Sequence, residues 1–171
     1  YSSDLQGTYQ QKNLQTAAIA LQQLNISTKV IQSGLMNVIS NTGIQGRWQT
    51  LSNDPFTIAD VAHNKEGLEH VVAQIKSLKY EELHLLLGFV KDKAVETLIK
   101  LFPANANFYF SAPDIPRALP IVDLEEIAIK LDLNYKMFSS VAQALAFVRA
   151  NAKDDDFIYI GGSTFVVAEI L

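Results

Sequence analysis

Residues 56–64 read Phe56-Thr57-Ile58-Ala59-Asp60-Val61-Ala62-His63-Asn64, an apolar run that ends in a carboxylate, an imidazole and an amide. The run predicts a β-strand over residues 56–60 followed by a helix. The apolar residues of that helix recur at the spacing of one helical face: Leu68, Val71, Val72, Ile75 and Leu78. Asn64 has a side chain suited to capping the helix. Because ligands of parallel sheets bind beyond the carboxyl ends of strands, we expect a ligand at this corner.

Strands and helices alternate through the rest of the chain. Strands are expected at residues 48–51, 56–60, 84–90, 107–110, 135–138 and 157–160. Helical patterns separate most of them, and three prolines enclose a loop that holds Arg117. The alternation predicts an α/β fold with a Rossmann-like open, mostly parallel sheet of about six strands and helices on both faces. The fold alone does not name a function.

The first 45 residues follow a different pattern. Residues 1–12 are polar and indicate a turn or linker, and a helix is expected to begin near Asn13 and to stop at Asn25. A second, weaker helix is expected at residues 34–39, before a glycine-containing stretch at 41–46. We therefore expect two parts, a helical lead-in at residues 1–45 and a domain at residues 46–171.

Composition excludes several classes of protein. The 171 residues are 49% hydrophobic, enough for one buried core, and the net charge of −4 without long charged runs does not favour nucleic-acid binding. The absence of cysteine excludes disulfides, thiolate nucleophiles and cysteine-bound metals. No apolar stretch approaches the ~18 residues of a membrane helix. We expect a cytoplasmic monomer, and the loop-like start without Met suggests a piece of a longer protein.

Several polar side chains fall at the expected carboxyl ends of strands. They are Asp60, His63, Asn64, Lys91, Asp92, Ser111, Arg117 and Ser163. Their convergence favours a ligand site, although Asn, Asp and Ser are also common helix caps. Asp60 could accept hydrogen bonds from a ribose. His63 could contact a phosphate or position a reacting carboxylate, because an imidazole can gain or lose a proton near neutrality.

Other features limit the chemistry of the chain. His70 and His84 lack obvious partners and are expected to be structural, and no spacing of His, Asp and Glu predicts a metal site. The sequence contains neither a Gly-Lys pair nor a Gly-x-Gly-x-x-Gly fingerprint. If the chain acts on a nucleoside triphosphate, another domain must hold most of the phosphates.

Short motifs along the chain resemble, in order, those of the folylpolyglutamate synthase and dihydrofolate synthase family of the Mur ligase superfamily. Asp60 to Asn64 is similar to the family's Asp-x-Ala-His-Asn motif. The other matching segments are Gly7-Thr8-Tyr9-Gln10-Gln11-Lys12-Asn13, Gly46-Arg47, Gly88-Phe89-Val90-Lys91-Asp92-Lys93, Pro116-Arg117-Ala118 and Gly162-Ser163. The resemblance covers nearly the whole chain. It implies the C-terminal domain of the ligase at residues 46–171, preceded by the tail of the central ATPase domain.

In that family, ATP phosphorylates a carboxylate to an acyl phosphate, and the amine of an incoming amino acid attacks it. The resemblance therefore implies an ATP-dependent ligase that adds L-glutamate to folate, or to dihydropteroate. Most of the triphosphate, with magnesium, would be held by the N-terminal ATPase domain outside this chain. The chain by itself is expected to be inactive.

The resemblance also assigns roles to single residues. It implies nucleotide contacts for Asn13, Arg47 and Asp60, and it places His63 and Asn64 near the transferred phosphate as catalytic residues. An arginine can neutralise phosphate charge as it shifts, and an aspartate can fix a nucleoside through its hydroxyls.

The remaining motifs imply substrate contacts for Arg117 and Ser163. Two positions depart from the family pattern. Ala94 stands where a second acidic residue is usual, and Lys65 stands where a proline is common. The departure at Ala94 leaves any role of that carboxylate open.

Two alternatives remain at the level of sequence. The chain could be the C-terminal domain of another Mur-type ligase. It could also be a non-enzymatic nucleotide-binding, ligand-binding or phospho-acceptor module with Asp60 as the receiver. A receiver domain would carry an acidic pair near its first strand, and no such pair is present here.

Overall fold

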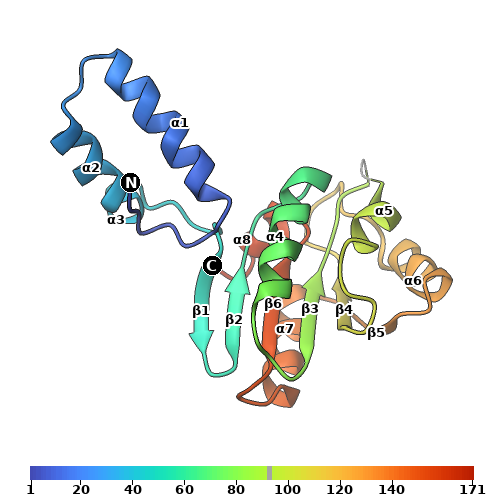
Figure 1. Ribbon diagram of the computed structural model, residues 1–171. Helices are drawn as coiled ribbons and strands as arrows, with labels where there is room; N and C mark the ends of the chain where they lie inside the picture. The colour runs from blue at the N-terminus through green and yellow to red at the C-terminus, as the bar shows by residue number, and fades with distance from the viewer. Residues whose placement is uncertain (92–93) are drawn as a thin grey trace.

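The computed structural model describes residues 1–91 and 94–171. Its main body is one six-stranded sheet in the order β1-β2-β6-β3-β4-β5 (Figure 1). The strands are β1 (Gln49–Asn53), β2 (Phe56–Ala59), β3 (Leu83–Leu87), β4 (Asn107–Ser111), β5 (Asn134–Phe138) and β6 (Phe157–Gly161). Only β1 is antiparallel to its neighbour. The predicted open, mostly parallel α/β sheet is confirmed.

Five helices belong to this sheet. They are α4 (Lys65–Ser77), α5 (Val95–Ile99), α6 (Ile121–Lys130), α7 (Val141–Asn151) and α8 (Thr164–Ala168). Because successive side chains of a strand point to opposite faces, the sheet has two apolar surfaces. Leu85 and Leu87 pack in the cluster that includes residues of α4, α5 and α6, whereas Leu86 packs with residues of α7 and α8.

The last strand of the chain lies in the middle of the sheet. Tyr159 of β6 is paired with Ile58 of β2 on one side and with Leu85 of β3 on the other. All five residues of β3 and of β6 are buried, as expected for strands covered on both faces. The carboxyl ends of β2, β6 and β3 therefore lie next to one another.

The predicted strand at residues 84–90 is too long, because β3 ends at Leu87. Beyond Gly88 the chain pairs with a loop in place of a strand. Phe89 accepts a hydrogen bond from the amide of Leu119 at 2.9 Å, and Val90 forms an isolated bridge with Ala118. The apolar residues Phe89 and Val90 therefore continue the run of β3 in sequence but lie outside the sheet.

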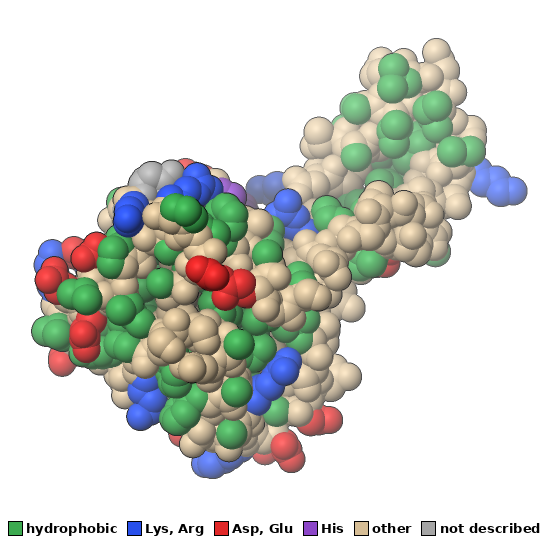
Figure 2. Space-filling model, turned by 180° about the vertical axis from the view of Figure 1, so that it is seen from behind, with side chains coloured by type: hydrophobic (Ala, Val, Ile, Leu, Met, Phe, Trp, Pro, Cys, Tyr) green, Lys and Arg blue, Asp and Glu red, His purple; other side chains and the backbone are tan. Residues whose placement is uncertain are grey.

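The helical lead-in stands away from the sheet (Figure 1). It consists of α1 (Gln10–Gln23), α2 (Thr28–Met36) and α3 (Val38–Thr42). A small apolar cluster of its own joins its first two helices, formed by Leu14, Ala18, Ile31 and Leu35. Further hydrophobic side chains of the lead-in are exposed, as Figure 2 shows from behind. In the part of the chain that the structure describes, no helix is long and apolar enough to cross a membrane.

The expected helix at residues 34–39 is wrong in its bounds. The structure has two helices there, which are separated at Asn37. Asp4 explains why α3 begins at Val38, since its carboxylate accepts hydrogen bonds from the amides of Val38 and Ile39 at 3.0 and 2.9 Å. The expected stop at Asn25 is close to the end of α1, and Asn25 adopts a left-handed φ of 58°.

Candidate functional site

A hollow of about 180 Å³ lies where β2 ends and α4 begins. Its lining residues are Tyr9, Arg47, Asp60, Val61, Ala62, His63, Asn64, Gly67 and His70. The structure thus brings together four of the predicted site residues, namely Arg47, Asp60, His63 and Asn64. The corner expected from the sequence is a concave surface with a cation, a carboxylate and an imidazole.

Asp60 is the buried carboxylate of this hollow, with 1% of its surface exposed. Its Oδ2 accepts hydrogen bonds from the Tyr9 hydroxyl and the Trp48 amide, each at 2.7 Å. Its Oδ1 accepts one from the amide of Ala62 at 2.8 Å. Burial raises the pKa of Asp60 above its ordinary value, while these bonds and the charge of Arg47 oppose the rise.

Arg47 is exposed and supplies the positive charge of the hollow. Gly46 before it has φ +69°, and a Cβ there would lie 2.6 Å from a side-chain carbon of Val61. The amide of Val61 donates to the carbonyl of Gly46 at 2.9 Å, so the two segments touch directly. Among the residues that the structure describes, Arg47 forms no ion pair, and its guanidinium remains available to an anion.

His63 and Asn64 connect the strand to the helix. Nδ1 of His63 lies 3.0 Å from the carbonyl oxygen of Val61. Because a carbonyl only accepts, this contact assigns the proton to Nδ1 and leaves Nε2 for a ligand. Oδ1 of Asn64 accepts a hydrogen bond from the amide of Gly67 at 2.9 Å, which confirms the predicted cap of α4.

The sequence did not predict three residues of the hollow, namely Tyr9, Gly67 and His70. No local pattern singled out His70, which lies three positions after Gly67 on the same face of α4. Tyr9 lies in the polar stretch of residues 1–12, which indicates a turn or linker, and in the segment from Gly7 to Asn13 that resembles a family motif. Its place in the site depends on how the lead-in meets the domain, which no local pattern shows.

Asn13, Arg117 and Ser163 do not line this hollow. Asn13 lies exposed on α1 and donates to the side chain of Gln10 at 2.9 Å. Ser163 is the buried cap of α8, because its hydroxyl accepts from the amide of Phe165 at 3.1 Å. The guanidinium carbon of Arg117 lies 5.0 Å from the centre of the Phe165 ring. Their roles in binding stay predictions.

The other polar candidates also lie apart from the hollow. The amide of Lys91 donates to the carbonyl of Arg117 at 3.1 Å, and the buried hydroxyl of Ser111 has no hydrogen-bond partner among the described residues. Asp92 and Lys93 of the glycine-containing motif lie outside the described residues. Within residues 1–91 and 94–171, no three or more His, Asp or Glu side chains are grouped as metal ligands.

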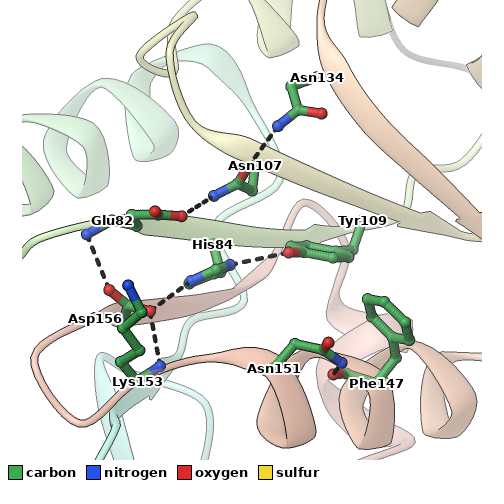
Figure 3. A network of polar contacts seen from close by, with 9 residues as sticks. All are labelled: Glu82, His84, Asn107, Tyr109, Asn134, Phe147, Asn151, Lys153 and Asp156. Atoms are coloured by element: carbon green, nitrogen blue, oxygen red, sulfur yellow. Dashed lines mark hydrogen bonds and ion pairs between the residues drawn. The ribbon is translucent and has the colours of Figure 1, made fainter.

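His84 has partners, contrary to the expectation from sequence. Its Nδ1 lies 3.0 Å from the Tyr109 hydroxyl, and its Nε2 lies 3.1 Å from Oδ2 of Asp156 (Figure 3). This network is at the amino end of β3, whereas the hollow is at the carboxyl end of β2. The contacts are internal to the protein, in agreement with the structural role that was expected for His84.

Comparisons with known proteins agree with this fold. A family model described as "Mur ligase, glutamate ligase domain" matches residues 46–164. The dihydrofolate synthase/folylpolyglutamate synthase of Escherichia coli is 31% identical over 165 residues, a match that covers 94% of this chain and 37% of the relative. A probable bifunctional folylpolyglutamate synthase/dihydropteroate synthase of Haloferax volcanii is 29% identical, with 96% of this chain and 20% of the relative covered.

A solved structure is similar as well. E. coli FolC in complex with DHPP and ADP gives a TM-score of 0.74 at 29% identity, over 85% of this chain and 34% of that chain. This chain therefore spans much less than half the length of the relatives that it matches.

Proposed function

Because this chain belongs to the Mur ligase family through its glutamate ligase domain, we propose that it is the glutamate-adding part of an ATP-dependent ligase that acts on folate. The observation that carries the proposal is the hollow that joins Arg47, Asp60, His63 and Asn64. The names of the relatives support folate, or dihydropteroate in dihydrofolate synthesis, as the acceptor of L-glutamate. The relative solved with ADP supports nucleotide binding.

The residues of the hollow suit a nucleotide at the edge of a larger site. Asp60 retains one acceptor position on Oδ1, which can take a hydrogen bond from a ribose hydroxyl. The exposed guanidinium of Arg47 can neutralise phosphate charge, an effect that can be worth several kcal/mol in a closed site. Asn13, on the lead-in, is proposed as a further nucleotide contact.

The transfer itself joins a carboxylate to an amine. ATP supplies the phosphoryl group that activates the carboxylate of the folate as an acyl phosphate, and the amine of L-glutamate then displaces phosphate. His63 and Asn64 are proposed to lie beside the transferred phosphate, where Nε2 of His63 is open to a ligand. Arg117 and Ser163 are proposed as substrate contacts.

Magnesium and most of the triphosphate are proposed to be held by other parts of the complete protein. When those other parts close on the residues of this chain, water is excluded from the acyl phosphate. The chain by itself is therefore expected to be inactive, and ATP hydrolysis by the purified 171-residue chain would contradict this expectation.

The phospho-acceptor alternative is disfavoured by the surroundings of Asp60. Its carboxylate is 1% exposed and already accepts three hydrogen bonds. A phosphoryl group bonded to either oxygen would need far more room than the one hydrogen bond that Oδ1 can still accept, and it would displace at least one of these donors. Phosphorylation of the chain by a small phosphodonor, lost in Asp60→Asn, would restore this alternative.

The test of the proposal is coupled turnover by the complete protein. Release of ADP and phosphate is expected only when a folate or pteroate and L-glutamate are both supplied, and the Arg47→Ala variant should lose this coupling. Arg149→Ala removes an exposed arginine of α7 and is the matched control, which should keep its activity. Turnover with a peptidoglycan precursor and without folate would assign the protein to another Mur ligase branch.

A further inference from the structure

One donor to Asp60 comes from outside the sheet domain. The hydroxyl of Tyr9 donates to Oδ2 across 51 positions of sequence. The other two donors are backbone amides of residues 46–171, namely those of Trp48 and Ala62. Among the residues that the structure describes, the lead-in thus contributes the single side-chain donor to the carboxylate of Asp60.

The loop that carries Tyr9 is itself fixed to the domain. The amide and the hydroxyl of Thr8 both donate to Oε1 of Gln74 on α4, at 2.8 and 2.9 Å. The Tyr9 ring lies over Gly7, where an added Cβ would come within 2.6 Å of it. These contacts set the position from which the Tyr9 hydroxyl reaches Asp60.

The bond pattern leaves a defined opening on the carboxylate. Each carboxylate oxygen accepts about two hydrogen bonds. Oδ2 accepts from Tyr9 and Trp48, whereas Oδ1 accepts from Ala62 only. With the Tyr9 bond in place, the free acceptor position belongs to Oδ1.

We propose that Tyr9 is a positioning residue of the nucleotide site, whose hydroxyl orients the Asp60 carboxylate so that Oδ1 can accept a hydrogen bond from a nucleotide hydroxyl. This inference rests on the proposed function. Tyr9 acts through Asp60 and is not assigned a contact with the reacting atoms.

The charges around Asp60 agree with this role. Burial and then the charge of Asp60 raise the pKa of Tyr9, so its hydroxyl remains a donor at neutral pH. The other titratable or charged groups that face this carboxylate or line its hollow are Arg47, His63, His70 and Tyr159. Burial raises the pKa of Asp60, and the Tyr9 bond is the largest opposing effect. Its loss would make Asp60 easier to protonate.

The test is Tyr9→Phe in the complete protein. The KM for ATP and the dissociation constant of ADP should rise about three- to tenfold, since one hydrogen bond no longer orients the carboxylate, with little change in kcat. The acid limb of kcat/KM for ATP should move to higher pH. Tyr135→Phe is the matched control, because it removes another hydrogen bond from a tyrosine to a carboxylate. That bond joins Tyr135 to Glu125 at 3.4 Å, at β5, the edge of the sheet opposite β1.

A second variant keeps the hydroxyl and loosens its support. Gln74→Leu removes the acceptor of both Thr8 bonds and should weaken ADP binding in the same direction but by less. If Tyr9→Phe does not fold, the ADP affinity of Gln74→Leu tests the role of Tyr9 in its place. Unchanged ADP affinity and an unchanged acid limb in the folded variant would overturn the role of Tyr9.

The outcome is separable from that of the proposed function. If the wild-type protein binds ADP but does not join glutamate to a folate, the proposed substrate is wrong, whereas weaker ADP binding by Tyr9→Phe still supports the positioning role. If ligation occurs and ADP binding does not depend on Tyr9, the proposed function stands and the inference fails.

Discussion

Nε2 of His84 lies 3.1 Å from Oδ2 of Asp156, and both side chains are buried at the amino end of the sheet. The carboxylate of Asp156 also accepts from the amides of Lys153 and Glu82, at 2.8 and 3.1 Å. On its other side the imidazole meets the hydroxyl of Tyr109, as Figure 3 shows. The network therefore joins β3 and β4 to the segment before β6.

Replacement of His84 should destabilise the protein strongly. In His84→Leu the Asp156 carboxylate and the Tyr109 hydroxyl lose a partner while they remain buried, which should lower the free energy of unfolding by about 2–4 kcal/mol. Urea denaturation measures the change. His70→Leu, at an exposed position on α4, should change the free energy of unfolding by less than about 0.5 kcal/mol. Equal effects of the two variants would show that the network adds nothing to stability.

Asp156 should make stability depend on pH in the acid range. Burial tends to raise the pKa of Asp156, but hydrogen bonds from the Lys153 amide, His84 and the Glu82 amide hold it below the ordinary value of 3.8. A lowered carboxyl pKa contributes stability above the unfolded-state pKa, and this contribution is lost as the pH falls through the folded-state pKa. Asp156→Asn should therefore have a lower free energy of unfolding than wild type at pH 7. This difference should narrow as the pH falls below the ordinary pKa of 3.8. Urea midpoints measured across this range would reveal a constant gap if the inference is wrong.

Asn64 has a structural role that can be separated from its proposed catalytic one. Asn64→Ala should cost about 1 kcal/mol of stability, because the amide of Gly67 loses its cap. Asn64→Asp keeps an acceptor oxygen and should keep stability, while it removes the side-chain amide and places a negative charge beside the position proposed for the transferred phosphate.

Stability and ligase activity of the complete protein are measured together for these variants. Asn64→Ala and Asn64→Asp should both lower activity. Ser140→Ala, which removes the cap of α7, should cost about as much stability as Asn64→Ala and leave activity unchanged. Full activity in Asn64→Asp would show that Asn64 only caps the helix.

Local signals account for much of the correct prediction. The strand that ends at Ala59, directly before Asp60, follows from periodicity, and the Asn64 cap follows from a contact within three residues, so both were predictable. The site beyond them was less so, because Tyr9 reaches Asp60 across 51 positions. The same limit explains the lead-in, where the carboxylate that caps α3 belongs to Asp4, 34 positions before Val38.

The position of Arg47 should depend on the glycine that precedes it. In Gly46→Ala the φ of +69° becomes strained, and the added Cβ would lie 2.6 Å from Val61. The chain must shift at that point, and Arg47 is the next residue. We therefore expect lower stability and a raised KM for ATP in the complete protein.

Gly43→Ala separates the two causes. Gly43 has a similar φ of +66°, but nothing lies within 4 Å of an added Cβ. This variant should show the conformational strain alone, about 1 kcal/mol of lost stability, with an unchanged KM. The difference between the two alanine variants then measures the effect of the Val61 contact on the placement of Arg47. If both variants raise the KM equally, backbone strain in the linker controls nucleotide binding, and the contact between Gly46 and Val61 does not place the guanidinium.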